Sequence, residues 1–301
     1  GNDASFPVAL FIHGGPGLSD RDFVISNLAP LWCKKFIVAS YDQRGTGGSY
    51  KGAKNSDINR STLIEDAKCV IEYLCCKYGK QKIFIIGTSW GTEIGAYLCR
   101  DFPQLIAGYI ACGQIVNGVD NANVSYQYAF DQAVKASDKK SLKKLLSIGR
   151  PLANGAYKNV FRGVATQMAI VTKYGGSTVK VGGVYSEIVK PTLQSKETTF
   201  VEKIRLGLGY IKGIKLLWVE AMNVDFANTC NKFSTPIFIF QGKYDMVTPS
   251  CLVKPWFDIV EAPDKKLVFF DKSAHAVMTE QLQEYTDMAF SVFAPYMDNA
   301  N

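Results

Sequence analysis

Apolar positions form two alternating patterns in the first third of the chain. Short runs that are apolar throughout predict buried strands at Pro7–Ile12, Phe36–Tyr41, Ile83–Ile86 and Ile106–Cys112. Apolar residues at helical spacing predict helices between them, at Phe23–Cys33, Thr62–Tyr78 and Trp90–Arg100. This alternation predicts an α/β fold with a mostly parallel sheet that is covered by helices on both faces.

The pattern changes in the middle of the chain and then returns. Between Asn117 and Asn231 only helices are expected, at 123–148, 157–174 and 197–223. Strands and helices then alternate again, at Pro236–Phe240, Pro249–Val260, Lys266–Phe270 and Thr279–Met297. We therefore expect a catalytic α/β domain made of residues 1–116 and 232–301, with residues 117–231 inserted as a helical cap.

Composition and charge narrow the possible partners. The chain has 301 residues, of which 47% are hydrophobic and 20% charged, as in ordinary globular domains. Its formal net charge is +7, and the excess of basic residues lies between Asn117 and Asn231. There the lysines recur at helical spacing and predict a solvated helix face, at Lys135, Lys139, Lys140, Lys143 and Lys144. Attraction to an acidic ligand or membrane surface is the alternative, and no nucleic-acid motif accompanies the charge.

The number and spacing of the cysteines indicate whether a metal site is expected and which cellular compartment is favoured. The eight cysteines form no C-x-x-C pair, and the chain has two histidines, so a structural zinc site is not expected. Most of the cysteines lie in apolar runs and are predicted to be buried, reduced thiols, which favours a cytoplasmic protein. No apolar stretch is long enough to span a bilayer. A strand follows Gly1 almost at once, so we expect further strands or a targeting segment upstream.

Polar motifs follow the predicted strands, where a parallel sheet binds its ligands. They read HGGPG after Ile12, DQRGTGGS after Tyr41, GTSWG after Ile86, QGKYDMVTP after Phe240 and DKSAHA after Phe270. Because the carboxyl ends of parallel strands share one edge of the sheet, these motifs are expected to lie together.

A serine between two glycines, within Gly87–Gly91, marks one of these turns as unusual. The G-x-S-x-G pattern is typical of a nucleophile elbow, whose small neighbours permit a tight turn that exposes the hydroxyl. Ser89 would need a base to activate its hydroxyl. The chain has two histidines, and because His13 belongs to a glycine turn, His275 is expected to be that base. Asp245 would fix the tautomer of that histidine. The order Ser89, Asp245, His275 is that of hydrolases with such elbows. A plain strand-ending turn is the alternative.

The HGGPG motif has a predicted role beside the nucleophile. Acyl transfer needs two backbone N–H groups that face the developing oxyanion. We expect one from Trp90, which follows the nucleophile, and one from Gly15, with Gly14 as the alternative donor. A glycine turn without this role is the other interpretation.

Taken together, HGGPG, DQRGTGGS, GTSWG, QGKYDMVTP and SAHAVMTEQ resemble the proline iminopeptidase (prolyl aminopeptidase) branch of the α/β-hydrolases. The resemblance covers about Pro7–Asn117 and Thr235–Met297. It implies a serine hydrolase that removes N-terminal residues from short peptides, with neither a metal nor an organic cofactor. It also implies further strands before the one that leads into HGGPG.

The resemblance further implies acidic cap residues that hold the amino group of the substrate. The cap glutamates are Glu187, Glu197, Glu202 and Glu220. Glu220, in LLWVEAMN, is the best candidate, and an ordinary helix-surface residue is the alternative. For Arg44 of DQRG we expect a structural role, in which it ties loops together near the site.

Two other functions remain open at this stage. A carboxylesterase or an amide hydrolase of small metabolites would use the same three residues, because specificity depends on the inserted segment. A non-catalytic binding protein on the same fold is a remote alternative. Epoxide hydrolases and dehalogenases of this fold carry aspartate at the elbow, and Ser89 argues against them.

Overall fold

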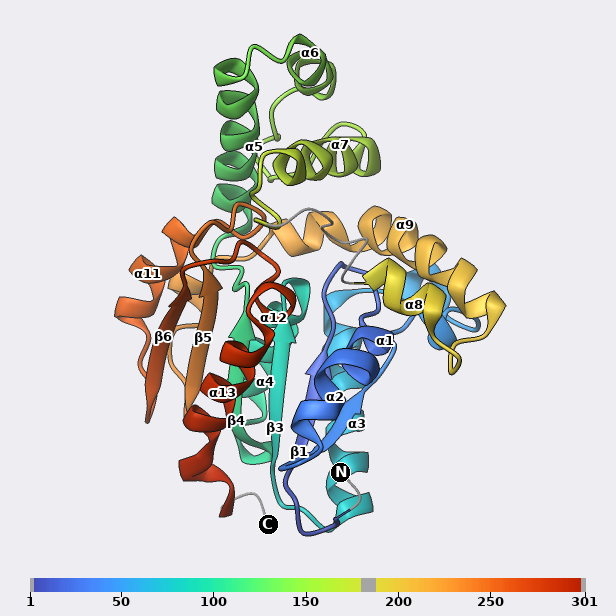
Figure 1. The fold of residues 1–301 in the computed structure, drawn as a ribbon, viewed down its shortest axis with the longest axis vertical. Helices are drawn as coiled ribbons and strands as arrows, with labels where there is room; N and C mark the ends of the chain where they lie inside the picture. Colours follow the sequence, from blue (N-terminus) through green and yellow to red (C-terminus); the bar gives the residue numbers. More distant parts are fainter. Residues whose placement is uncertain (1–2, 180–187, 299–301) are drawn as a thin grey trace.

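A six-stranded sheet forms the centre of the computed structural model, which describes residues 3–179 and 188–298 (Figure 1). The strand order is β2-β1-β3-β4-β5-β6, and every neighbouring pair is parallel. The strands are β1 (Val8–Ile12), β2 (Ile37–Ser40), β3 (Ile83–Thr88), β4 (Ile106–Cys112), β5 (Ile237–Gly242) and β6 (Lys265–Phe270). The predicted α/β architecture with a parallel sheet is confirmed.

Helices cover both faces of this sheet, because successive side chains of a strand point to opposite faces. Leu10 and Ile12 pack into one cluster with α3 (Arg60–Tyr78), α4 (Trp90–Asp101) and α11 (Ser250–Ile259). Ala9 and Phe11 pack into the other cluster, whose helices are α1 (Arg21–Phe23), α2 (Ala29–Trp32), α12 (Val277–Glu280) and α13 (Leu282–Phe293). The rings of Phe11 and Trp32 meet edge to face in the second cluster, with centroids 5.0 Å apart.

Shorter elements complete the catalytic layers. Helix α10 (Phe226–Thr229) precedes β5. The single-turn elements are the π-helical η1 (Val24–Leu28) and the 3₁₀ turns η2 (Gly47–Ser49), η3 (Asn55–Asp57), η4 (Pro103–Leu105) and η6 (Ala294–Tyr296). The predicted helix Phe23–Cys33 is therefore present as a short chain of α1, η1 and α2.

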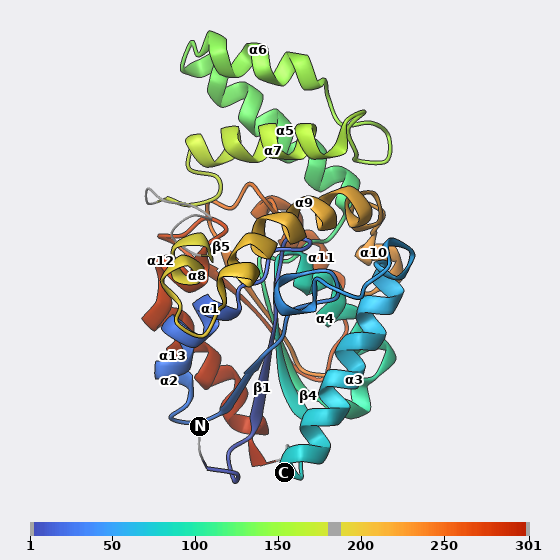
Figure 2. The same cartoon turned by 90° about the vertical axis from the view of Figure 1, so that its right-hand side faces the viewer.

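In the part of the chain that the structure describes, five helices lie between β4 and α10. They are α5 (Gly118–Lys135), α6 (Lys139–Ile148), α7 (Val160–Lys173), α8 (Lys190–Gln194) and α9 (Phe200–Met222). Figures 1 and 2 draw α5, α6, α7 and α9 above the carboxyl ends of the strands and α8 beside α1. No strand interrupts them within the part of 117–231 that the structure describes. We propose that residues 117–231 act as one cap and residues 1–116 and 232–301 as one catalytic domain.

The predicted helix 123–148 is in fact two helices. Ser137, between α5 and α6, has φ +51°, which a continuous right-handed helix does not permit. Asp138 then starts α6, because its carboxylate accepts a hydrogen bond of 3.0 Å from the backbone N–H of Ser141. A local capping interaction therefore ends a helix that the apolar spacing alone would continue.

Two surface expectations can be compared with the structure. All five lysines of the predicted basic face are exposed. Lys135 ends α5, and the other four belong to α6. Cysteine burial is more mixed than predicted, because Cys69, Cys76 and Cys251 are exposed, whereas three others are buried: Cys99, Cys112 and Cys230. Among the described residues, no helix is both long enough and apolar enough to cross a bilayer.

Candidate active site

Ser89 stands on a strained turn between β3 and α4. Its φ of +53° and ψ of −121° lie outside the regions that non-glycine residues ordinarily adopt. Three hydrogen bonds hold this conformation. The Ser89 N–H donates to the carbonyl of Cys112 (2.9 Å), and its own carbonyl accepts from the backbone N–H and the hydroxyl of Thr92 (2.8 and 2.6 Å). The backbone thus forms the tight elbow that the motif predicted.

The two glycines of the motif are required by space. A Cβ atom added at Gly91 would lie 2.1 Å from the carbonyl oxygen of Ile12, and one at Gly87 would lie 2.6 Å from that of Gly91. Neither contact is possible, since the obstructing atoms belong to the backbone. The G-x-S-x-G spacing therefore brings α4 close to the end of β1.

The structure places His275 next to Asp245. The Nδ1–H of His275 donates to Oδ2 of Asp245 over 2.8 Å, and Thr248 Oγ1 lies 3.2 Å from the same nitrogen. This bond selects the tautomer in which Nε2 is unprotonated and can accept a proton. The backbone N–H of His275 donates to the carbonyl of Ser177, in the segment after α7 (2.9 Å).

Asp245 is fully buried and is held by hydrogen bonds on both oxygens. Oδ1 accepts from the backbone N–H groups of Val247 (2.8 Å) and Thr248 (2.9 Å). Oδ2 accepts from the amide of Gln241 and the hydroxyl of Thr248, in addition to His275. Five donors offset the cost of burying a carboxylate, so the fold supplies the stabilisation that its charge requires.

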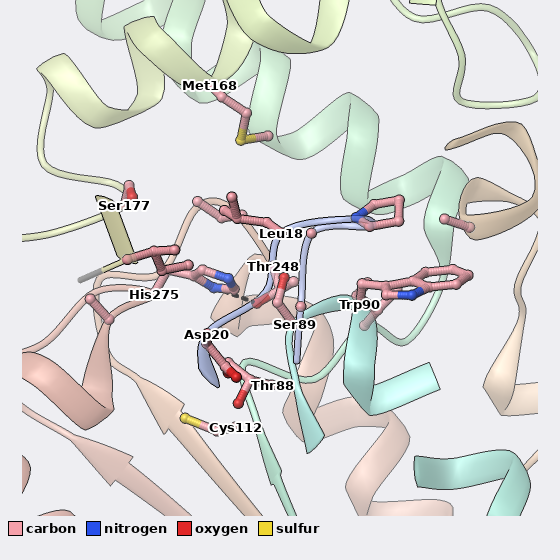
Figure 3. Close-up of a pocket in the computed structure, with 18 of the residues that line it drawn as sticks. Leu18, Asp20, Thr88, Ser89, Trp90, Cys112, Met168, Ser177, Thr248 and His275 are labelled. Carbon is pink, nitrogen blue, oxygen red and sulfur yellow. Dashed lines mark hydrogen bonds between the residues drawn. The ribbon is translucent and has the colours of Figure 1, made fainter. Parts of the chain in front are cut away.

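A cavity of about 170 Å³ opens between the strand ends and the helices above them (Figure 3). The predicted residues that line it are Ser89, His275, Gly14, Gly15 and Trp90. Asp245 lies behind His275 and does not line the cavity. Figure 3 shows Met168 of α7 on the helical side of the cavity, opposite Thr88 of β3.

The HGGPG loop is fixed against the elbow by His13. His13 is buried, and burial lowers the pKa of its imidazole, so it is neutral. Its Nδ1–H donates to the carbonyl of Gly14 (2.9 Å), and its Nε2 accepts from the backbone N–H of Gln43 (3.1 Å). Gln43 in turn accepts from the indole N–H of Trp90 (3.2 Å). His13 is a structural residue here and does not line the cavity.

The same loop packs closely against α9. A Cβ atom at Gly17 would lie 2.4 Å from the carbonyl oxygen of Gly209, and one at Gly213 would lie 2.5 Å from that of Pro16. Glycines on both sides therefore permit this backbone contact between the HGGPG loop and a helix of the inserted segment.

Glu220 lies away from Ser89, in a different hollow. Its Oε2 accepts from the backbone N–H of Arg60 (2.7 Å), and its carbonyl accepts from the guanidinium of Arg60 (3.0 Å). It does not line the cavity at Ser89 but a hollow that also contains Tyr97 and Asn117. The geometry gives no support to Glu220 as the residue that binds an amino group.

The other cap glutamates are also placed elsewhere, as far as the structure describes them. Glu202 is engaged by Thr199 in a capping box at the start of α9, and Glu197 is exposed. Glu187 lies outside the described residues.

Arg44 has the structural role expected for it. Its guanidinium donates two hydrogen bonds to Asp66 of α3, of 2.8 and 2.6 Å. Asp42 joins the DQRG loop to the HGGPG loop, because it accepts from Ser19 (2.5 Å) and Arg21 (2.9 Å). Neither Asp42 nor Arg44 lines the cavity.

Three residues near the site were not identified from the sequence. Gln241 and Thr248 flank Asp245 and bind its carboxylate, and Asp20 lines the cavity beside the HGGPG loop. The only available signal was proximity, since each lies within a few residues of a motif already singled out.

Comparisons with known proteins identify the family and the fold. The sequence matches the family profile described as alpha/beta hydrolase fold over residues 7–281. "Probable aminopeptidase YbaC" from Bacillus subtilis (strain 168) is 26% identical over 285 residues, which cover 93% of this chain and 87% of that protein. The structure of VinJ has a TM-score of 0.66 at 14% identity, covering 97% of this chain and 91% of VinJ. Proline iminopeptidase from Mycobacterium smegmatis has a TM-score of 0.64 at 13% identity, covering 100% and 93%. The chain belongs to the α/β-hydrolase fold family and is a hydrolase.

Proposed function

We propose that this hydrolase is a serine hydrolase in which Ser89 is the nucleophile, His275 the base and Asp245 the orienting carboxylate. The observation that carries the proposal is the arrangement of these three residues. Ser89, on its strained turn, and His275, with its Nδ1 bound to Asp245, line the same cavity. A strained backbone and a partly buried His–carboxylate pair are typical of activated nucleophiles.

The chemistry follows from the tautomer of His275. Nε2 of His275 takes the proton of Ser89 Oγ while Oγ attacks the carbonyl carbon of the substrate. The same proton then passes to the leaving amine or alcohol as its bond to carbon breaks. A water molecule then attacks the acyl-enzyme while Nε2 of His275 takes its proton. The proton passes to Ser89 Oγ as the acyl group leaves as a carboxylic acid, which restores the Ser89 hydroxyl. Asp245 stabilises the imidazolium during each step.

We further propose that the N–H groups of Gly15 and Trp90 bind the oxyanion. The Trp90 amide is at the first position of α4, where backbone N–H groups have no partner within the helix. Support for Gly15 over Gly14 comes from the Gly14 carbonyl, which His13 holds. In a trans peptide the C=O and N–H point in opposite directions, so the Gly15 N–H is directed away from His13.

For the substrate, we propose a free N-terminal residue of a short peptide, as in a proline iminopeptidase-like aminopeptidase. Two of the similar proteins are named as a probable aminopeptidase and a proline iminopeptidase. The cavity, at about 170 Å³, is smaller than the ~300–1,000 Å³ of pockets for drug-sized ligands, which suits a substrate of one or two residues.

A carboxylesterase or amide hydrolase of small metabolites is the second candidate. The observation in its favour is the apolar lining of the cavity, where Leu18, Phe23, Val164 and Met168 would accept an acyl chain as readily as an amino-acid side chain.

Labelling with a fluorophosphonate probe tests the serine mechanism directly. Wild-type protein should be labelled, Ser89→Ala should not, and the control Ser147→Ala, changed at an exposed serine on α6, should be labelled as wild type. Turnover of Ser89→Ala should be about 10⁶-fold lower. A Ser89→Ala protein that keeps a tenth of the activity would exclude Ser89 as the nucleophile.

A substrate panel tests the specificity. Aminoacyl 4-nitroanilides, including those of proline and leucine, would be compared with short acyl 4-nitrophenyl esters. Preference for the anilides in kcat/KM supports the aminopeptidase, whereas turnover of the esters alone supports the second candidate.

A further inference from the structure

The cavity at Ser89 contains one carboxyl group that the proposed mechanism does not use. Its described lining includes charged residue types at two positions, Asp20 and His275. The rest is largely apolar, with contributions from the loop after β1, from α7 and from α9. Figure 3 draws Asp20 on the strand side of the cavity, together with Ser89 and His275. A carboxyl group in such surroundings requires an explanation.

Asp20 is buried without a partner for one of its oxygens. The residue is 8% exposed, and within residues 3–179 and 188–298 its Oδ1 has no hydrogen-bond partner. It precedes α1 but does not cap it through its side chain. Among the described residues no cation forms an ion pair with it, because the neighbouring Arg21 is directed toward Asp42 (2.9 Å) and Thr198 (2.9 Å).

The surroundings of Asp20 do not stabilise its ionised form, which a cation could stabilise. Burial raises the pKa of Asp20 to about 7, and the negative charge of Asp42 adds to the effect, although the backbone N–H of Asp20 opposes it. A cation that entered the cavity would stabilise the ionised carboxylate, since ion pairs strengthen as the local dielectric falls. Apart from His275, which the proposed mechanism uses, no cationic side chain lines the described part of the cavity, so the substrate is the available source.

We propose that Asp20 binds the ammonium group of the substrate and so selects substrates with a free amine close to the scissile carbonyl. The inference rests on the proposed function and names the group that would give it specificity. In an aminoacyl substrate the ammonium is one carbon away from the carbonyl that Ser89 attacks. Its acceptor must therefore lie in the same cavity, where Asp20 does and Glu220 does not.

Kinetics on a matched substrate pair test this role. Leucine 4-nitroanilide and its N-acetyl derivative would be assayed with wild type, Asp20→Asn and the control Asp22→Asn, whose carboxylate accepts from Thr198 and does not line the cavity. For the free amine, kcat/KM of Asp20→Asn should fall about 10- to 100-fold, mainly through KM, as expected for loss of a charged hydrogen bond. The acetylated substrate should change less than about threefold, and Asp22→Asn should match wild type. Equal losses on both substrates, or no loss on the free amine, would overturn the assignment.

A binding measurement separates this inference from the proposed function. Ser89→Ala would be titrated at pH 7 with leucinamide and N-acetylleucinamide, because α-amino groups are then largely protonated. Leucinamide should bind at least about tenfold more tightly, and the double variant Ser89→Ala/Asp20→Asn should lose the preference. Equal binding of the two amides would overturn the role of Asp20 whatever the reaction. A preference for leucinamide without probe labelling or turnover in wild type would retain Asp20 and refute the proposed hydrolysis.

Discussion

Asp245 and Asp20 are buried carboxyl groups in loops that follow strands of the same sheet, yet their surroundings differ. Asp245 is fully buried and accepts hydrogen bonds from five donors, including His275. Asp20 is nearly as buried, but none of the described residues donates a hydrogen bond to its Oδ1. The loop after β5 stabilises its carboxylate in advance, whereas the loop after β1 leaves that stabilisation unmet.

The two proposed roles, orientation of His275 by Asp245 from behind the cavity and recognition of a cation by Asp20 in its wall, require different surroundings. A carboxylate that must stay ionised to orient a histidine needs its own donors. A carboxylate that recognises a cation gains from having few, since a blocked or neutral ligand would leave it desolvated and unpaired. A buried carboxylate with few donors lowers the stability of the protein, and such destabilising residues are typical of functional sites.

The largest effect on activity is expected from replacing Asp245. In Asp245→Asn the side chain keeps its shape but can hold His275 in the wrong tautomer, so kcat should fall about 10⁴-fold on any substrate. Free-amine and acetylated substrates should be affected alike, which distinguishes this group from Asp20. Asp258→Asn, at an exposed position on α11, serves as the control. A loss below tenfold would contradict the orienting role.

Replacing Asp20 should instead stabilise the protein, and more so at higher pH. The pKa of Asp20 is raised from 3.8 to about 7 in the folded state, so the folded protein binds the proton more tightly than the unfolded chain. No penalty exists below about pH 4, where both states are protonated. The cost of an ionised Asp20 in the folded state grows between about pH 4 and pH 7 and is then constant, reaching on the order of 4 kcal/mol at about 1.4 kcal/mol per pH unit.

Urea unfolding at pH 4.5, 6 and 7.5 measures this effect. The free energy of unfolding of Asp20→Asn, minus that of wild type, should increase along this series. The control Asp131→Asn, at an exposed carboxylate of α5, should give a difference that is independent of pH. A constant difference for Asp20→Asn as well would show that its carboxyl group carries no penalty in the native state.

Removing one donor from Asp245 should have the smallest effect. Thr248→Val deletes the hydroxyl that donates to Oδ2 (2.8 Å) and should lower the free energy of unfolding by about 1 kcal/mol. Thr248→Ser keeps the hydroxyl and should restore most of this loss. If valine and serine variants unfold at the same urea concentration, the hydroxyl is not part of the network that stabilises Asp245.

Much of the fold could be predicted from local pattern. Each strand was expected within about two residues of its observed ends, because burial on both faces makes parallel strands apolar throughout. The elbow geometry at Ser89 was expected as well, because the sterics that require Gly87 and Gly91 act between residues close in sequence or at the end of the adjacent strand. The break at Ser137 was missed, since a single cap can end a helix despite continued apolar spacing.

The sequence by itself determined the order of the chemical groups along the chain and the edge of the sheet that they share. Only the tertiary structure decided which of them have partners. Glu220 meets Arg60 across 160 positions, and Arg21 meets Thr198 across 177, and these contacts take both charged groups away from the cavity. For the same reason, Asp20 Oδ1 has no hydrogen-bond partner among the described residues. Periodicity depends on neighbours in the chain, whereas burial and pairing depend on which distant segments pack together, and no local pattern contains that information.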